Sequence, residues 1–155
     1  MRSYIEEILK LYGKRIREYM VPAMQSLFSA DKGAEAIKCR VKFHSIVAKL
    51  LYLGKRGRPH ILMPIQFLCT RVKSPNVEDE WKLERVLGYL QLTKAWTRTF
   101  DKSPFERITT YIDESFMMHE DGKSQSACLV MMGNPLVQES CRKQQLVTKT
   151  PQKRN

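Results

Sequence analysis

The stretch SACLVMMGNPLVQES at residues 126–140 decides the fold of the second half of the chain. Two short β-prone runs, 126–132 and 136–140, flank the turn-forming tripeptide Gly133-Asn134-Pro135. Two strands joined by so short a connection must be antiparallel. A third β-prone run, ITTYID at residues 108–113, lies upstream of them. The sequence therefore predicts a small antiparallel sheet.

The N-terminal part of the chain instead carries apolar residues at helical spacing. A capping-box pattern opens a helix that is predicted over residues 3–19. Further helices are predicted over 35–53 and over 60–72, and Pro64 is expected to kink the last of these. The side chains expected to face the core from the first two helices are Ile5, Ile8, Leu9, Tyr12, Ile16, Val41, Ile46, Val47, Leu50 and Leu51.

A fourth helix is predicted to begin after Asn76, whose side chain can cap it. Its apolar stripe is expected to consist of Trp81, Val86, Leu87 and Leu90. Trp81, together with Tyr89 and Trp96, could also stack on nucleobases, but its helical spacing favours a place in the core. Helical periodicity is lost after Gln91.

We therefore expect an α+β protein with two parts. A helical region is predicted over 1–95 and a partial antiparallel sheet over 106–148, with the boundary between 95 and 105. Residues 149–155 continue a basic C-terminal stretch without acidic residues and are predicted to form a disordered tail.

The composition favours a polyanionic partner. Lys and Arg number 27 against 16 Asp and Glu, which gives a formal net charge of +11. Such an excess attracts nucleic acid, and RNA, DNA or an RNA–DNA hybrid, bound through backbone phosphates, is the expected partner. An anionic membrane is the rival, but the sequence has no apolar run of about 18 residues and no signal-peptide core. We expect an intracellular protein.

Six basic residues are candidates for contact with phosphates. Lys55, Arg56 and Arg58 lie at a predicted helix junction. The additional candidates are Arg71, Lys73 and Lys82. A run of charge is more often simply a solvated face, so phosphate contact and plain solvation both remain open for this set.

One acidic residue, Asp113, is the candidate metal ligand, because it ends a predicted strand. Glu114, Glu120 and Asp121 follow it, the last two in a loop-like stretch. Hydrolysis of phosphodiesters by two metal ions needs several carboxylates around ions about 3.5–4 Å apart. Asp113 alone cannot hold both ions, and the scattered Cys and His residues lack metal-ligand spacing, so no bound cofactor is expected.

Several motifs, in order, resemble the segment that follows the polymerase palm in copia-type retrotransposon reverse transcriptases. Residues 43–52 and 55–61 (FHSIVAKLLY and KRGRPHI) resemble that family's "lLyla.RtRPDI". Residues 67–75 (FLCTRVKSP) continue the resemblance, and residues 81–93 (WKLERVLGYLQLT) are similar to "W..lkRvLrYLkgT". The resemblance implies a helical thumb or connection-like region.

The second half looks like the opening strands of the same family's ribonuclease H domain. Residues 111–116 (YIDESF), 123–126 (KSQS) and 143–149 (KQQLVTK) are similar to "yvDaSf", "KShtG" and "KQklvtkSSTEAE". The resemblance gives Asp113 the place of a ribonuclease H carboxylate. His60 and Glu114 depart from the family pattern, which usually has Asp and a small residue there. Ala127 stands where the family has Gly.

The resemblance implies a polyprotein that copies RNA into DNA and removes the template RNA. The polymerase "YvDD" carboxylates are expected upstream of Met1, and the glutamate of "SSTEAE" is expected after Lys149, where this sequence has TPQKRN. We therefore expect a transposable-element remnant that is catalytically inactive alone, keeps Asp113 as a vestigial ligand and binds nucleic acid without sequence preference.

Two alternatives remain open. In the first, the chain is a ribonuclease H subunit completed by another chain, for example the rest of the polyprotein, and Mg²⁺ or Mn²⁺ binds only then. In the second, it is a basic module that holds a partner protein through an exposed sheet edge.

Overall fold

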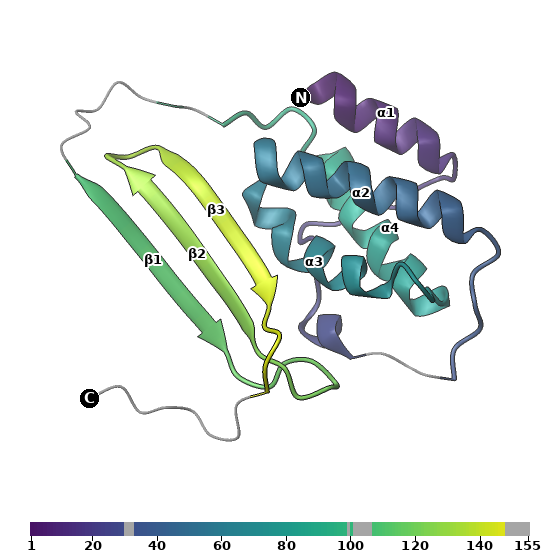
Figure 1. The fold of residues 1–155 in the computed structure, drawn as a ribbon. Helices are drawn as coiled ribbons and strands as arrows, with labels where there is room; N and C mark the ends of the chain where they lie inside the picture. Colours follow the sequence, from purple (N-terminus) through teal and green to yellow (C-terminus); the bar gives the residue numbers. More distant parts are fainter. Residues whose placement is uncertain (30–32, 99, 101–106, 148–155) are drawn as a thin grey trace. The chain divides into compact units, whose positions relative to one another are not determined.

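The helices and the strands belong to different parts of the chain (Figure 1). The computed structural model describes residues 1–29, 33–98, 100 and 107–147. The chain divides into two compact units, Met1–Arg98 and Thr99–Asn155. In the described residues the first unit holds four α-helices and the second a three-stranded antiparallel sheet, so the expected α+β class is confirmed.

Some expectations fall outside what the structure describes. The tail predicted over 149–155 lies outside the described residues. No helix in the described part of the chain is both long and apolar enough to cross a membrane.

One hydrophobic core unites the helical unit. Its elements are α1 (Arg2–Tyr12), η1 (Gln25–Phe28), α2 (Arg40–Arg56), η2 (Pro59–Ile61), α3 (Leu62–Arg71) and α4 (Val77–Leu92), where η marks a short 3₁₀ helix. The predicted core residues that are buried are Ile5, Ile8, Tyr12, Ile16, Ile46, Val47, Leu50, Val86, Leu87 and Leu90. Leu9 and Leu51 pack against this core while partly exposed.

α1 ends at Tyr12, well before the predicted end at residue 19. Gly13 closes the helix in the left-handed conformation, with φ 67°, and its N–H donates to the Leu9 carbonyl at 3.2 Å. Glycine adopts this conformation without the steric strain that a Cβ atom introduces. The helix therefore stops there, although Ile16 beyond it is still buried.

α2 begins at Arg40, five residues later than predicted, because the preceding backbone pairs elsewhere. Ala36 forms an antiparallel bridge with Asn76 just before α4. The expected inward position of Val41 is wrong, since its side chain is 78% exposed. Phe43 takes that place, because it lies three, four and seven residues before the buried Ile46, Val47 and Leu50.

Pro64 does not kink α3. It is the third residue of the helix, in the first turn, where a backbone N–H has no helical acceptor in any case. The short turn η2, with Pro59 at its start, precedes α3 instead.

α4 has the predicted cap but a different apolar face. Asn76 accepts a hydrogen bond from the Asp79 N–H, and the Asp79 carboxylate accepts one from the Asn76 N–H, which completes a capping box. The prediction that Trp81 lies in the core is wrong, because its side chain is 65% exposed. Leu83 is buried instead. Trp81 precedes Leu83 by two residues, which corresponds to a rotation of about 200° around the helix axis, so Trp81 faces away from the core.

The second unit is a sheet with the strand order β1-β2-β3. Its strands are β1 (Ile108–Ser115), β2 (Gln125–Met132) and β3 (Leu136–Lys143), and both neighbouring pairs are antiparallel, as predicted. Gly133, with φ 65°, supplies the positive φ in the tight connection between β2 and β3. The register shifts by one residue after Val130, so β3 carries a bulge.

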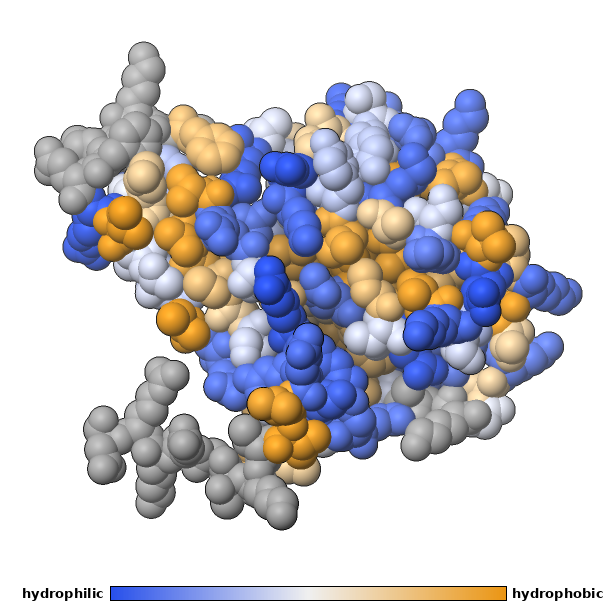
Figure 2. Space-filling view, in the orientation of Figure 1, coloured by the Kyte–Doolittle hydropathy of each residue, from blue (hydrophilic) through white to orange (hydrophobic). Residues whose placement is uncertain are grey.

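The sheet has no core of comparable size. All members of the hydrophobic core belong to the helical unit, among the residues that the structure describes. The β1 side chains Ile108, Tyr111 and Ile112 are exposed, the last of them by 72%. Figure 2 shows hydrophobic side chains, in orange, at the surface over the strands. In the described residues β1 and β3 are both edge strands.

Amide hydrogen exchange should separate the two units. We expect α4 amides to exchange about 100-fold or more slowly than those of β1, because α4 is anchored in the core and β1 is an edge strand with exposed apolar side chains. Exchange followed by mass spectrometry of peptides from 77–92 and 108–115 measures this. Equal protection of both peptides would contradict the expectation and show that the sheet is as stable as the helical core.

Candidate nucleic-acid interface

The six predicted basic residues occupy different environments. Lys55 and Arg56 are exposed in the last turn of α2. Arg58 is only 4% exposed, and its Nη2 donates to the Thr93 carbonyl at 2.6 Å. Burial lowers the pKa of this guanidinium, which still remains charged at neutral pH. Arg58 therefore joins η2 to the end of α4, and its predicted role in phosphate contact is corrected to a structural one.

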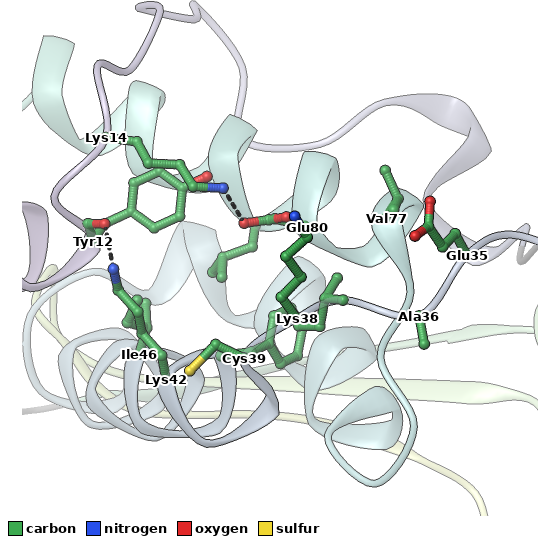
Figure 3. A pocket seen from close by; sticks show the side chains of 13 residues that line it. Tyr12, Lys14, Glu35, Ala36, Lys38, Cys39, Lys42, Ile46, Val77 and Glu80 are labelled. Atoms are coloured by element: carbon green, nitrogen blue, oxygen red, sulfur yellow. Dashed lines mark hydrogen bonds and ion pairs between the residues drawn. The ribbon is translucent and has the colours of Figure 1, made fainter.

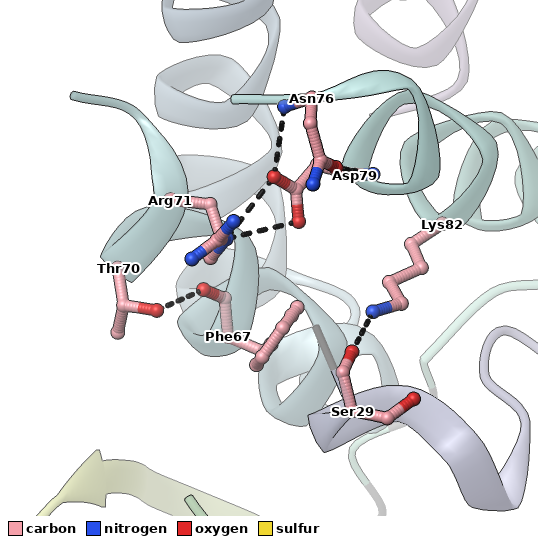
Figure 4. Close-up of polar contacts among 7 residues, drawn as sticks. All are labelled: Ser29, Phe67, Thr70, Arg71, Asn76, Asp79 and Lys82. Atoms are coloured by element: carbon pink, nitrogen blue, oxygen red, sulfur yellow. Dashed lines mark hydrogen bonds and ion pairs between the residues drawn. The ribbon is translucent and has the colours of Figure 1, made fainter. Parts of the chain in front are cut away.

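Arg71 also has an internal partner (Figure 4). Its Nε lies 3.1 and 3.0 Å from the two carboxylate oxygens of Asp79, whose side chain is 1% exposed. The same carboxylate accepts the Asn76 N–H at 3.0 Å. The guanidinium neutralises a buried charge at the start of α4, so Arg71 has a structural role there, and its contact with phosphates stays a prediction.

The side chain of Lys82 has internal partners, whereas that of Lys73 is exposed. The Lys82 ammonium donates to the Ser29 carbonyl and lies 4.7 Å from the centroid of the Phe67 ring (Figure 4). Lys73 is exposed after α3, and its backbone carbonyl accepts a hydrogen bond from Arg40 at 3.0 Å. Lys73 therefore lies at the N-terminal end of α2, while Lys55 and Arg56 lie at the other end.

Further basic side chains gather at the N-terminal end of α2. Lys14, Lys38 and Lys42 line a cavity of about 410 Å³ (Figure 3). Arg40 is the first residue of α2, and its side chain donates a hydrogen bond to the Lys73 carbonyl. We call Lys14, Lys38, Arg40, Lys42 and Lys73 the α2 basic end.

Two lysines of the α2 basic end are held by neighbours. The Lys14 ammonium lies 2.6 Å from a carboxylate oxygen of Glu80, and Lys42 donates to the Tyr12 carbonyl at 2.8 Å (Figure 3). The exposed Lys38 forms no ion pair with any residue that the structure describes. The first turn of α2 contains no acidic residue. The positive end of the helix dipole therefore adds to the lysine charges.

Tyr12 forms part of the wall of the same cavity. Burial, and after it the nearby carboxylates of Glu84 and Glu80, raise the pKa of its phenol well above the usual value. The phenol therefore stays neutral, and the charged side chains that line the cavity are Lys14, Lys38 and Lys42 together with Glu35 and Glu80.

Asp113 lies on β1, away from any group of carboxylates. It is exposed, and its carboxylate accepts a hydrogen bond from the Glu114 N–H at 2.9 Å. Glu114 points to the opposite face of the strand, where it accepts a hydrogen bond from Gln144 at 2.8 Å. In the described part of the chain, no three His, Cys, Asp or Glu side chains converge as metal ligands. These residues do not fit a site for two metal ions.

Asp121, the other acidic candidate with visible partners, is held by lysines. Its carboxylate lies 2.9 Å from the Lys143 ammonium and 3.4 Å from that of Lys123. The hydrogen bond from Lys143 is the main reason why the pKa of Asp121 is lowered. Asp121 therefore stabilises the loop before β2 and the end of β3.

No protein-family model, curated protein or solved structure matches this chain. The interpretation of the surface therefore depends on its geometry. Sequence reasoning missed Lys14, Lys38 and Lys42 because Lys14 lies more than 20 residues before Lys38 and Lys42 in the sequence, and each segment has ordinary spacing. Lys38, Arg40 and Lys42 have one local signal, since they alternate without an acidic residue between them.

Proposed function

We propose that this chain binds nucleic acid through backbone phosphates, without reading base sequence, and that the α2 basic end is a principal contact. The motifs that resemble copia-type reverse transcriptases support a role as part of such a polyprotein. In that role the helical unit corresponds to the thumb or connection-like region, and the sheet to the opening strands of a ribonuclease H domain.

The observation that carries the proposal is the gathering of five basic residues around one helix end. They come from the segment after α1, the start of α2 and the turn after α3. Ammonium groups bind phosphates as point charges and carry no base information. Lys38 and Lys73 are the members whose side chains are most available for a ligand, since both are exposed while the side chains of Lys14, Arg40 and Lys42 donate hydrogen bonds.

Lys55 and Arg56 provide a second contact at the other end of α2. Sixteen residue steps along α2 (Arg40–Arg56) correspond to about 24 Å. Duplex nucleic acid rises about 3.4 Å per base pair, so a duplex of about seven base pairs spans the distance. Shorter duplexes reach only one of the two basic ends.

The proposal includes no hydrolysis by this chain alone. Asp113 is the one acidic residue on β1 that matches the family motif, and Glu114 next to it faces the other way. The exposed apolar side chains of β1 favour a second candidate function, in which the sheet edge holds a partner protein. A partner bound in this way would be insensitive to polyanions.

Binding to a fluorescein-labelled duplex, followed by anisotropy over a salt series, tests the proposal. We expect the affinity to fall steeply with salt, with little dependence on base sequence. The variant Lys38→Ala should reduce the slope of log K against log salt by about 0.9, because one phosphate contact is lost.

Arg142→Ala is the matched control, since it removes the same charge from an exposed position in the sheet unit. It should leave the slope unchanged. Absence of binding at the lowest salt, or binding independent of salt, would contradict the proposed function. A normal slope for Lys38→Ala would exclude the α2 basic end as the contact.

A further inference from the structure

A second cavity, of about 230 Å³, lies between the connector that follows α1, residues 13–29 with η1 at its end, and the outer face of α4. Tyr19, Met24 and Leu27 come from the connector, and Trp81 and Arg85 come from α4. We call this cavity the Trp81 groove. It is separate from the cavity at the α2 basic end, with which it shares no lining residue.

Aromatic rings and cations alternate along this groove. Trp81 and Arg85 are four residues apart and therefore lie on the same face of α4. The Arg85 guanidinium carbon lies 4.3 Å from the centroid of the Tyr19 ring, and that of Arg17 lies 6.0 Å from it. The two arginines thus flank one ring, and the indole of Trp81 lies one helical turn from Arg85.

The apolar part of the groove is open to water. Trp81 is 65% exposed and Met24 is 58% exposed, and the connector residues Met20 and Val21 are exposed as well. A group of large apolar side chains on a highly charged protein marks a binding surface more often than isolated exposed residues do. An indole offers a flat, rigid face that loses little conformational entropy when a planar ligand stacks on it.

The charge of the groove selects the kind of ligand. Lys82 and Arg85 line it together with the carboxylate of Glu78, and Arg17 lies outside the lining, next to the Tyr19 ring. Lys82 is held by the Ser29 carbonyl and the Phe67 ring, so it shapes the wall (Figure 4). The two arginines therefore provide the anion contacts. A ligand that uses both features has a planar ring next to an anionic group.

We propose that the Trp81 groove binds single-stranded nucleic acid, with one base stacked on Trp81 and the adjacent phosphates at Arg85 and Arg17. This inference rests on the proposed function and adds a preference for strand type. In a duplex both faces of each base are covered by neighbouring bases, so a duplex offers no free ring to Trp81. Single strands offer one at every nucleotide.

Trp81→Ala, compared with Trp96→Ala, tests the inference. Trp96 is a matched control because it is 63% exposed, packs edge-on against Tyr89 at 6.3 Å and does not line the groove. Trp81→Ala should weaken binding of a labelled single-stranded oligonucleotide about 5- to 150-fold and leave duplex binding within about 2-fold of the wild type. Trp96→Ala should change neither, and Trp81→Phe should restore part of the single-strand affinity.

Fluorescence gives a second measurement. In a Trp96→Phe background Trp81 is the remaining tryptophan. Stacking predicts that its emission is quenched by a thymidine oligonucleotide and not by an abasic oligonucleotide of the same length. Equal quenching by both would overturn the inference, because phosphate contact alone would then explain it.

The remaining outcomes separate this inference from the proposed function. Unchanged single-strand affinity in Trp81→Ala, with the slope effect of Lys38→Ala intact, would overturn the inference and leave the proposed function standing. Equal loss of single-strand and duplex affinity would also overturn it. Competition by polyglutamate as strong as by the oligonucleotide would show a preference for acidic peptides and overturn it as well. No binding of any nucleic acid at low salt would reject both.

Discussion

Replacing Asp79 with alanine is expected to lower the free energy of unfolding of the helical unit by about 3 kcal/mol. Asp79 is 1% exposed and accepts hydrogen bonds from Arg71 and from the Asn76 backbone. Its removal leaves the Arg71 guanidinium without its partner and breaks the capping box of α4. The loss is at the lower end of the range for buried pairs, because the Arg71 side chain is 27% exposed.

Urea unfolding followed by circular dichroism at a helical wavelength measures this loss. Thermal unfolding is a second measurement. For a domain of about 60–100 residues, each kcal/mol of lost stability lowers the melting temperature by about 4–8 °C, so a drop of about 12–24 °C is expected. Glu7→Ala is the control, because it removes a surface partner of Lys49 and should leave the unfolding free energy nearly unchanged. A similarly small loss in Asp79→Ala would mean that the buried pair contributes no more than a surface one.

Gly88→Ala is expected to destabilise the helical unit by about 2–3 kcal/mol, against the usual trend for helices. In an exposed helix interior, alanine is more favourable than glycine by about 1 kcal/mol. At Gly88, however, a Cβ atom would lie 2.0 Å from the Arg17 carbonyl oxygen and 2.6 Å from the Tyr19 ring. The backbone of the connector must move to accept it, and Tyr19 must move with it.

The same experiment has a readout at the Trp81 groove. Displacement of Tyr19 should separate its ring from Arg85, so Gly88→Ala should also weaken single-strand binding. Gly57→Ala is the control, since the nearest atom to its Cβ would be the flexible Met1 side chain at 3.3 Å. Its unfolding free energy should stay within about 1 kcal/mol of the wild type. A stabilising effect of Gly88→Ala would contradict the close packing of α4 on the connector.

The secondary structure was predictable where one local signal dominated. Asn76 correctly predicts the start of α4, and Gly133-Asn134-Pro135 correctly predicts the turn between β2 and β3. The errors at Val41 and Trp81 have one cause: each lies two residues before a buried residue, Phe43 or Leu83. Helical periodicity fixes the width of an apolar face, but contacts with other elements decide which residues belong to it.

The candidate site was less predictable, because it depends on contacts distant in sequence. Arg58 and Arg71 look like surface charges in the sequence, and only the Thr93 carbonyl and the Asp79 carboxylate show that they are structural. Lys14 and Lys38 line the same cavity because both segments contact the start of α4. Lys14 pairs with Glu80 of α4, and Ala36, two residues before Lys38, forms a bridge with Asn76. Neither arrangement has a signal in the local sequence.

The strand order β1-β2-β3 has a consequence for the speed of folding. Strands that are neighbours in space are also neighbours in sequence, so each pairing closes only a short loop. Such local pairing has low contact order, and hairpins form in about 1–10 μs. The helical unit must instead bring Ala36 to Asn76 and α1 to α4. The sheet, with little apolar burial to hold it, should therefore open and close many times during the lifetime of one folded helical core.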